Sequence, residues 1–212
     1  MPFLVHSSRV RGRRLAEASD RDLLDAVVEG AEDAFDELVA RKAGQLLQLV
    51  YRMVGDREEA RDLVQLAFVR AWENRDRYDR RWSPNTWLYR IATNLSIDFM
   101  RSRGSRARLD EPVRRHLYEV ASSGHRHELS RLEHHEVERI LGTLLDDLSE
   151  RQRSVFVLRE IEGLSSREVG EILGCRASTV RNHLFAARRE LRARLLERYP
   201  EYARAYSEEE ER

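Results

Sequence analysis

The chain has 212 residues, of which 41% are hydrophobic and 36% charged, and its formal net charge at pH 7 is zero. This length allows one large domain or two small ones, and a neutral total argues against a uniformly basic DNA-binding protein. The charge is nevertheless uneven, because residues 17–73 carry 14 acidic against seven basic residues, whereas residues 70–115 carry 12 arginines against six acidic residues. Such a division is expected of a chain with one half facing protein and the other facing nucleic acid.

The cysteine count and the hydropathy pattern predict a cellular location. The single cysteine, Cys175, has no partner for an internal disulfide, which favours a reducing compartment. The N-terminal stretch MPFLVHSSRVRGRR has an apolar start too short for a signal peptide, and its charges follow that start. No apolar run approaches membrane-spanning length. We therefore expect a cytoplasmic protein that makes no membrane contact itself.

The N-terminal quarter of the chain predicts an arm and two helices. Residues 1–18 are expected to form a disordered basic arm. An amphipathic helix follows, and a second begins near Ala34 and runs to Met53, before Gly55 ends it. Asp56 then caps the next helix. The apolar face of the first helix consists of Leu23, Leu24, Val27 and Val28.

Residues 57–103 contain two further amphipathic helices joined by a basic, aromatic loop. The second of these helices is capped by Ser83 and carries Pro84 at its first position. Helical spacing predicts the buried stripe of the first helix as Ala60, Leu63, Val64, Ala67, Phe68, Ala71 and Trp72. The same spacing predicts the buried face of the second helix as Leu88, Ile91, Ala92, Leu95 and Phe99.

Two surfaces of this unit are predicted to need a partner. On the first helix, four polar and apolar residues lie opposite the apolar stripe: Asp62, Gln65, Leu66 and Val69. Such a mixture is typical of a protein-binding face, and the alternative is that these are scattered surface apolar residues. The loop mixes arginines, which neutralise phosphate, with rings that stack on unpaired bases. A solvated loop with tryptophans anchored in the core is the alternative there. The loop residues concerned are Arg75, Arg77, Tyr78, Arg80, Arg81 and Trp82.

Residues 104–130 are rich in glycine, serine, proline and charge, and they predict a linker. Four histidines in and just beyond this segment raise the question of a metal site: His125, His127, His134 and His135. Their spacing does not match a zinc site, and no cysteine accompanies them. We expect neither a metal nor a cofactor.

Residues 131–198 predict a second helical domain. Ser149 with Gln152 and Ser165 with Glu168 form capping boxes at two helix starts. A tight turn at Cys175 precedes the last helix, so the order is that of a helix-turn-helix, and the cysteine is expected to serve packing. Groups able to read bases or hold phosphate lie away from the buried stripe of the last helix: Ser178, Arg181, Asn182, Phe185 and Arg192. The acidic residues 199–212 are expected to form a disordered tail.

The segments RDLVQLAFVRAW and WLYRIATNLSID closely resemble region two of bacterial sigma factors, in the small extracytoplasmic-function group. The resemblance implies that the first helix docks on the clamp helices of the RNA polymerase β′ subunit through Asp62, Gln65, Leu66 and Val69. Leu66 departs from the family, which usually has an acidic residue there. The loop and the following helix would open the minus-ten element and capture a flipped base. The residues implied in that capture are Arg75, Arg77, Tyr78, Asn85 and Arg90.

The segment LSSREVGEILGCRASTVRNHLFAARREL resembles region four of the same family, which reads the minus-thirty-five element in the duplex major groove. By this resemblance Arg181, Asn182 and Phe185 read bases. Phosphate contacts are implied for Ser178 and Thr179 at the helix start and for Arg188. Ala186 replaces a frequent arginine, so we expect a different promoter sequence. The resemblance also implies the polymerase β flap and an anti-sigma factor as partners.

The sequence therefore predicts an all-α protein with two small helical domains, a region-two bundle (19–103) and a region-four helix-turn-helix (131–198), joined by a flexible linker. It would bind core RNA polymerase, recognise promoter DNA and promote initiation, with the polymerase supplying the chemistry. One alternative is a stand-alone helix-turn-helix regulator of duplex operators, which a core polymerase pull-down distinguishes. A second alternative is an enzyme that uses the histidines with Glu133 or Glu136, which metal analysis distinguishes.

Overall fold

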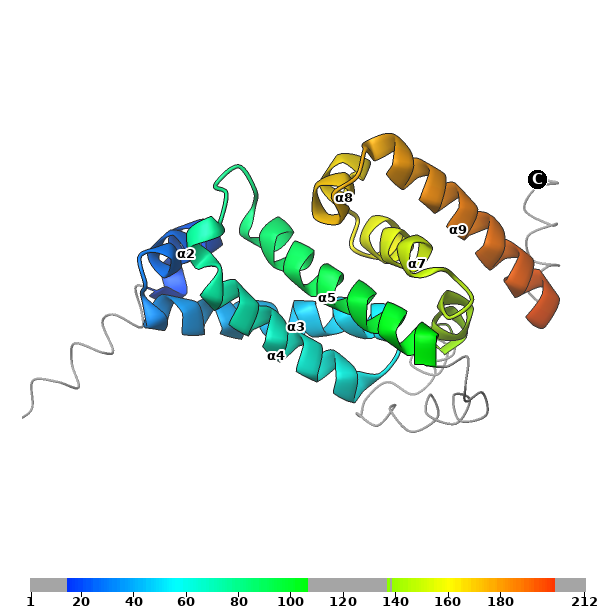
Figure 1. Ribbon diagram of the computed structural model, residues 1–212, viewed down its shortest axis with the longest axis horizontal. Coiled ribbons are helices and arrows are strands. Elements are labelled where there is room, and N and C mark those ends of the chain that lie inside the picture. Colours follow the sequence, from blue (N-terminus) through cyan, green and yellow to red (C-terminus); the bar gives the residue numbers. More distant parts are fainter. Residues whose placement is uncertain (1–14, 107–136, 138, 201–212) are drawn as a thin grey trace, which may run out of the picture.

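The computed structural model describes residues 15–106, 137 and 139–200, and all of the regular structure in these residues is helical. Short helical stretches at residues 15–17 and 139–145 flank the two main groups of helices. The expectation of an all-α protein is therefore confirmed. In chain order (Figure 1) the elements are α2 (Asp20–Val28), α3 (Glu32–Val54), α4 (Arg57–Glu73), the 3-10 turn η1 (Arg75–Arg77), α5 (Pro84–Arg106), α7 (Glu150–Phe156), the π-helical turn η2 (Val157–Ile161), α8 (Ser166–Leu173) and α9 (Ala177–Arg198).

The helix ends lie where the capping residues predict them. The side chain of Asp56 accepts hydrogen bonds from the backbone N–H groups of Glu58 and Glu59, at 2.9 and 3.1 Å. Both predicted capping boxes, at Ser149 and Ser165, are formed. Gly174 ends α8 with a φ of 65°, a left-handed conformation that glycine adopts without steric cost.

Helices α2 to α5 form the first domain, in which α3 packs against α2, α4 and α5. The predicted apolar stripes of α2, α3 and α4 supply most of its core. Helix α5 is buried on more sides than its stripe predicts, because Trp87, Tyr89 and Ile97 are also buried. The reason is that α5 contacts α3 and α4 on one side and α7 and α8 of the second domain on the other.

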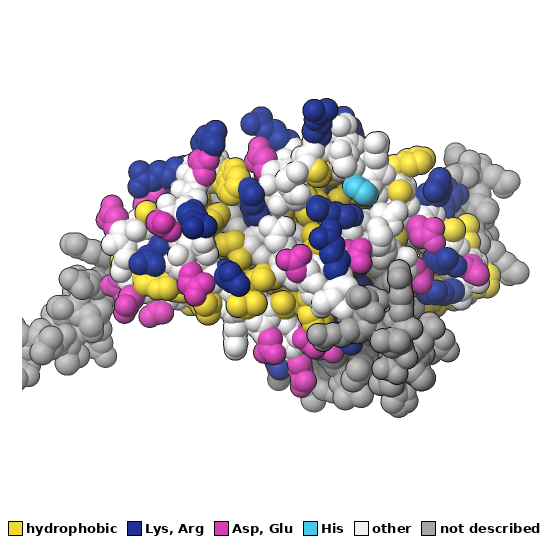
Figure 2. Space-filling view, viewed as in Figure 1, with side chains coloured by type: hydrophobic (Ala, Val, Ile, Leu, Met, Phe, Trp, Pro, Cys, Tyr) yellow, Lys and Arg dark blue, Asp and Glu magenta, His cyan; other side chains and the backbone are white. Residues whose placement is uncertain are grey.

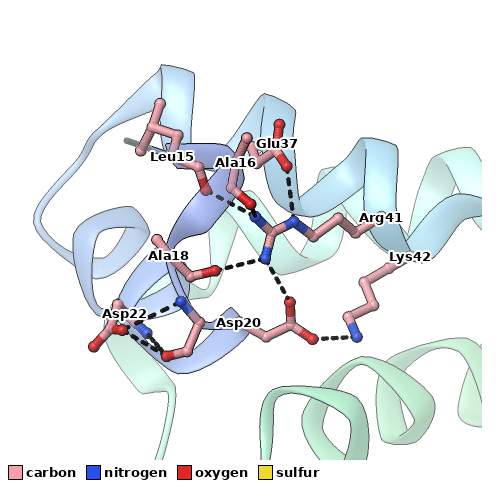
Figure 3. Close-up of polar contacts among 9 residues, drawn as sticks. Leu15, Ala16, Ala18, Asp20, Asp22, Glu37, Arg41 and Lys42 are labelled. Carbon is pink, nitrogen blue, oxygen red and sulfur yellow. Dashed lines mark hydrogen bonds and ion pairs between the residues drawn. The ribbon is translucent and has the colours of Figure 1, made fainter. Parts of the chain in front are cut away.

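The end of the predicted N-terminal arm is held by Arg41 of α3 (Figure 3). Its guanidinium donates to the carbonyl oxygens of Leu15, Ala16 and Ala18 at 2.7 to 2.9 Å. Arg41 also donates to the carboxylate of Asp20, which forms an ion pair with Lys42. The side chain of Lys42 is almost fully buried. The prediction of a disordered arm is therefore wrong for residues 15–18, which are fixed to the first domain. The remainder of that arm lies outside the described residues.

The second domain is built from α7, η2, α8 and α9, with α9 packed across α7 and α8. Its helix-turn-helix requires glycine at position 170 as well as at the turn. A Cβ atom on Gly170 would lie 2.6 Å from the backbone carbonyl oxygen of Cys175. The backbone N–H of Cys175 in turn donates to the carbonyl of Gly170 at 2.9 Å. Helix α8 and the turn that follows it therefore approach each other at a distance that only glycine allows.

The two domains pack against each other through a polar cluster, which the sequence did not predict. Glu162, just after η2, accepts hydrogen bonds from Arg52 of α3 at 3.1 Å and from the Tyr89 hydroxyl of α5 at 2.9 Å. Arg153 of α7 donates to the carbonyl of Arg52 at 3.0 Å and pairs with Asp146 at 2.6 Å. The domains are thus docked, and most of the predicted linker lies outside the described residues.

Candidate protein and nucleic-acid interfaces

The outer face of α4 carries the predicted protein-binding residues, and all four are exposed. Leu66 is 39% exposed and Val69 51%, and Asp62 and Gln65 flank them on the same face. The opposite face of α4 supplies the core of the first domain, so helical geometry directs these four side chains outward. Exposed branched apolar side chains beside a carboxylate and an amide are suited to contact another protein.

Residues 74–83, here called the arginine loop, connect α4 to α5. The guanidinium of Arg75 lies 4.3 Å from the centre of the Trp72 ring and donates to the Trp72 carbonyl at 2.7 Å. Arg77 is exposed, and Asn85 is exposed in the first turn of α5. Arg90, one turn further along α5, lies 4.5 Å from the centre of the half-buried Trp82 ring. Two arginine–aromatic pairs, Arg75 with Trp72 and Arg90 with Trp82, therefore lie at this end of the first domain.

Tyr78 lies differently from our expectation. It is only 8% exposed, its ring centre lies 5.3 Å from that of Trp87, and its hydroxyl donates to the carbonyl of Trp82 at 2.7 Å. Burial raises the pKa of this hydroxyl above its ordinary value. The ring is therefore not open to an incoming base in this structure. Trp82, which we named in the loop without assigning it a contact, is the partly exposed ring beside Arg90.

The last helix, α9, presents the predicted base-reading face to solvent. Arg181 and Asn182 are exposed, and Phe185 is 70% exposed although it is a large apolar residue. Ser178 is exposed in the first turn, and Thr179 is half-buried beside it. The same helix buries Val180, Leu184, Ala187 and Leu191, and this spacing directs the reading face away from the core.

Arg188, predicted as a phosphate contact, is already paired within its own domain. Its Nη2 atom lies 2.9 Å from both carboxylate oxygens of Glu160. The guanidinium remains more than half exposed, so a phosphate has access to the N–H groups that Glu160 leaves unused. A contact between Arg188 and DNA would therefore compete with, or share, an existing ion pair.

The space-filling view shows where these surfaces lie relative to one another. Figure 2 shows basic side chains along the upper edge, over the arginine loop, α8 and the start of α9. Apolar and acidic side chains gather lower on the same view, over the α4 side of the first domain. The upper edge is therefore the more basic part of this face of the molecule.

The predictions on metals and membranes concern partly undescribed residues. All four histidines of the linker region lie outside the described residues. Within the described ranges, His, Cys, Asp and Glu side chains form no group of three or more suited to a metal ion. None of the described helices is both long and apolar enough to cross a membrane. Cys175 is half-buried and packs against the core of the second domain.

Comparison with known families places these surfaces in a protein class. The family described as Sigma-70 region 2 matches residues 38–106, and the family described as Sigma-70, region 4 matches residues 138–191. The two matches cover the two domains in the order predicted. They define the class of the protein as a sigma-70-type factor.

Individual relatives identify the group of sigma factors to which the chain belongs. The chain is 36% identical over 174 residues to the ECF RNA polymerase sigma factor SigW of Bacillus subtilis, covering 80% of this chain and 92% of SigW. It is 31% identical over 176 residues to the ECF RNA polymerase sigma-E factor of Escherichia coli, covering 81% and 92% of the two chains. The solved structure of CnrH in complex with the cytosolic domain of CnrY is similar with a TM-score of 0.61 at 28% identity, covering 83% of this chain and 96% of that chain. The chain belongs to the family of ECF RNA polymerase sigma factors, which are transcription initiation factors.

Proposed function

We propose that this sigma factor uses three separate surfaces when it directs core RNA polymerase to a promoter. The outer face of α4 docks on the polymerase, α9 reads duplex DNA at the minus-thirty-five element, and the arginine loop with the start of α5 holds the unpaired minus-ten strand. The observation that carries this proposal is the exposure of Phe185 beside the exposed Arg181 and Asn182 on α9. A fold that packed this face of the helix inside the protein would bury the ring.

Duplex recognition uses the side-chain chemistry of α9. An arginine donates two hydrogen bonds to the O6 and N7 atoms of guanine, an asparagine pairs with adenine, and an apolar ring contacts the methyl group of thymine. Arg181, Asn182 and Phe185 supply these three groups from one exposed helix face. Ser178 and Thr179 lie in the first turn of α9, where free backbone N–H groups favour a phosphate.

Strand capture uses the other end of the molecule. Arg77 and Asn85 are exposed and suited to phosphate and base edges, while Trp82 and Arg90 offer a flat ring and a guanidinium plane for a flipped base. Arg75 supports this end by packing on Trp72. Because a flipped base exists only in unpaired DNA, its binding to Trp82 and Arg90 favours the open state of the promoter over the closed one. Tyr78 contributes as a buried support of the loop.

Polymerase docking uses Asp62, Gln65, Leu66 and Val69 of α4. The chain performs no chemistry, since RNA synthesis belongs to the polymerase, and it acts in the cytoplasm where that enzyme works. The similar protein CnrH is solved with the cytosolic domain of CnrY. An anti-sigma factor is accordingly a further expected partner of this chain.

The test is reconstitution with purified core polymerase. Wild-type protein should form a holoenzyme and support promoter-dependent transcription from a genomic fragment library. Asp62→Arg should reduce holoenzyme formation while thermal unfolding stays unchanged, because Asp62 is exposed on α4. Arg101→Ala, at an exposed site near the end of α5, is the matched control. If Asp62→Arg forms holoenzyme as wild type does, the docking surface is not this face of α4. If the protein binds duplex DNA tightly without polymerase, a stand-alone regulator is favoured instead.

A further inference from the structure

We infer that α2 is a positioning element for the arginine loop and that Arg21 and Asp25 are the residues through which it acts. The inference rests on the proposed strand-capture function, and it assigns a role to residues outside the proposed contacts. Helix α2 contacts η1 and α5, and the residues that it joins to the loop lie 55 to 61 positions apart in the sequence. Three hydrogen bonds join α2 to the loop.

Arg21 binds the loop backbone at two adjacent places. Its Nη1 atom donates to the carbonyl oxygen of Arg80 at 3.2 Å, and its Nη2 atom donates to the carbonyl oxygen of Trp82 at 3.5 Å. One carbonyl directly precedes the Arg81–Trp82 dipeptide and the other ends it, so one guanidinium binds the backbone at both ends of this dipeptide. A planar guanidinium presents two nitrogens to two acceptors at once, whereas a lysine has a single nitrogen.

Asp25 binds the side chain of the same loop segment. Its Oδ1 atom accepts from the Nε of Arg80 at 3.0 Å, which draws that guanidinium toward α2. The neighbouring Arg81 is held by Asp79 at 2.6 Å. Among the ion pairs of the described residues none involves Arg77, whose exposed guanidinium therefore remains open to phosphate. Asp25 therefore holds Arg80 in a supporting position, while Arg77 is left to contact the DNA.

Arg21 and the Tyr78 hydroxyl both bind the backbone of Trp82. Its carbonyl accepts from Arg21 of α2 and also from the buried Tyr78 hydroxyl at 2.7 Å, so donors from two elements fix the same peptide group. The ring of Trp82 is then held 4.5 Å from the guanidinium of Arg90. A loop ordered before the strand arrives loses less conformational freedom on binding, which strengthens binding without any new contact. Removing the α2 anchors should weaken strand capture while leaving α4 and α9 unaffected.

The experiment uses holoenzyme reconstituted from core polymerase and the full chain. The probe is a single-stranded DNA oligonucleotide that wild-type holoenzyme enriches from a random-sequence pool. Arg21→Ala should lower the affinity of holoenzyme for this oligonucleotide about tenfold, which corresponds to one or two lost hydrogen bonds. Asp25→Arg should lower the affinity as well, and the exchange Asp25→Arg with Arg80→Asp should restore it. Arg101→Ala is the control, and core affinity and thermal unfolding should match wild type in every variant.

The outcomes separate this inference from the function on which it rests. If wild-type holoenzyme enriches no single-stranded sequence, the proposed strand capture fails, and the inference fails with it. If enrichment succeeds and Arg21→Ala binds as wild type does, strand capture stands and the role of α2 is rejected. If the exchanged pair does not restore the affinity lost by Asp25→Arg, the Asp25–Arg80 contact is not the means of positioning. A fall in thermal stability that parallels the loss of affinity would reduce Arg21 to a purely structural residue.

Discussion

The recognition helix α9 and the arginine loop are the two surfaces proposed to contact DNA, and they are built in different ways. On α9 each exposed residue follows from its position relative to the buried stripe at Val180, Leu184 and Ala187. The arginine loop has only one 3-10 turn, and its remaining conformation depends on Arg21 and Asp25 of a distant helix. The surface of a helix is therefore specified by its own sequence, whereas the surface of an irregular loop is specified by contacts with the rest of the fold.

The largest expected effect concerns the helix-turn-helix that carries α9. Gly170→Ala should destabilise the second domain by roughly 1–3 kcal/mol, because the new Cβ would overlap a backbone carbonyl that has little freedom to move. A Cβ atom at this position would lie 2.6 Å from the carbonyl oxygen of Cys175. Chemical unfolding and duplex DNA binding should both be impaired.

Gly44→Ala is the matched control for that substitution. Gly44 is an exposed glycine inside α3, and a Cβ there meets nothing within 4 Å. Replacing a helical glycine by alanine at an open site should stabilise the protein by about 0.5–1 kcal/mol. Equal unfolding free energies for the two variants would contradict the close approach at Gly170.

The next effect concerns base reading by α9. Arg181→Ala should lose on the order of 1–3 kcal/mol of discrimination between promoter sequences, as expected for one bidentate contact to guanine. Competition between specific and altered minus-thirty-five duplexes measures this loss. Arg194→Ala is the control, since Arg194 lies further along the same helix and pairs with Glu190 and Glu197. Unchanged promoter choice in Arg181→Ala would remove this residue from the reading face.

A smaller effect distinguishes support from contact in the arginine loop. Tyr78→Phe keeps the ring and removes the hydroxyl that donates to Trp82. If Tyr78 acts as a buried support, the affinity of holoenzyme for the enriched single strand should fall by about 0.5–1.5 kcal/mol, the value of one hydrogen bond. If the ring stacks directly on a base, as the family resemblance implies, phenylalanine should bind as well as tyrosine does.

The smallest effect concerns the interface between the two domains, which α5 forms with α7 and α8. Burial, together with the negative charge of Glu162, raises the pKa of the Tyr89 hydroxyl above its ordinary value of 10.0. The folded state therefore holds this proton more tightly than the unfolded chain, and the stabilisation is complete below pH 10 and declines as the pH rises further. The difference in unfolding free energy between wild type and Tyr89→Phe should shrink above pH 10. A difference that stays constant with pH would show that Tyr89 is not the titrating group.

Most of the fold was predictable because its signals are local. Capping residues such as Asp56 and Ser165, and terminating glycines such as Gly174, act within one helical turn. The exposure of Leu66 and Val69 followed from the same periodicity. The burial of Tyr78 and the docking of the domains through Glu162 were not predictable, because the partners Trp87, Arg52 and Tyr89 come from other elements. Amphipathic patterning records which side of a helix is apolar, but it does not record which irregular segment will cover that side.

The buried position of Lys42 has a practical consequence. It is the only lysine of the chain, and its side chain is 8% exposed and paired with Asp20. An amine-reactive dye at mild pH should therefore attach to the terminal α-amino group, whose pKa is about 7.7–8.0 in ordinary surroundings. Fluorescent labelling of a single site should be possible without introducing a new cysteine, and it should leave the arginines of the DNA-facing surfaces unmodified.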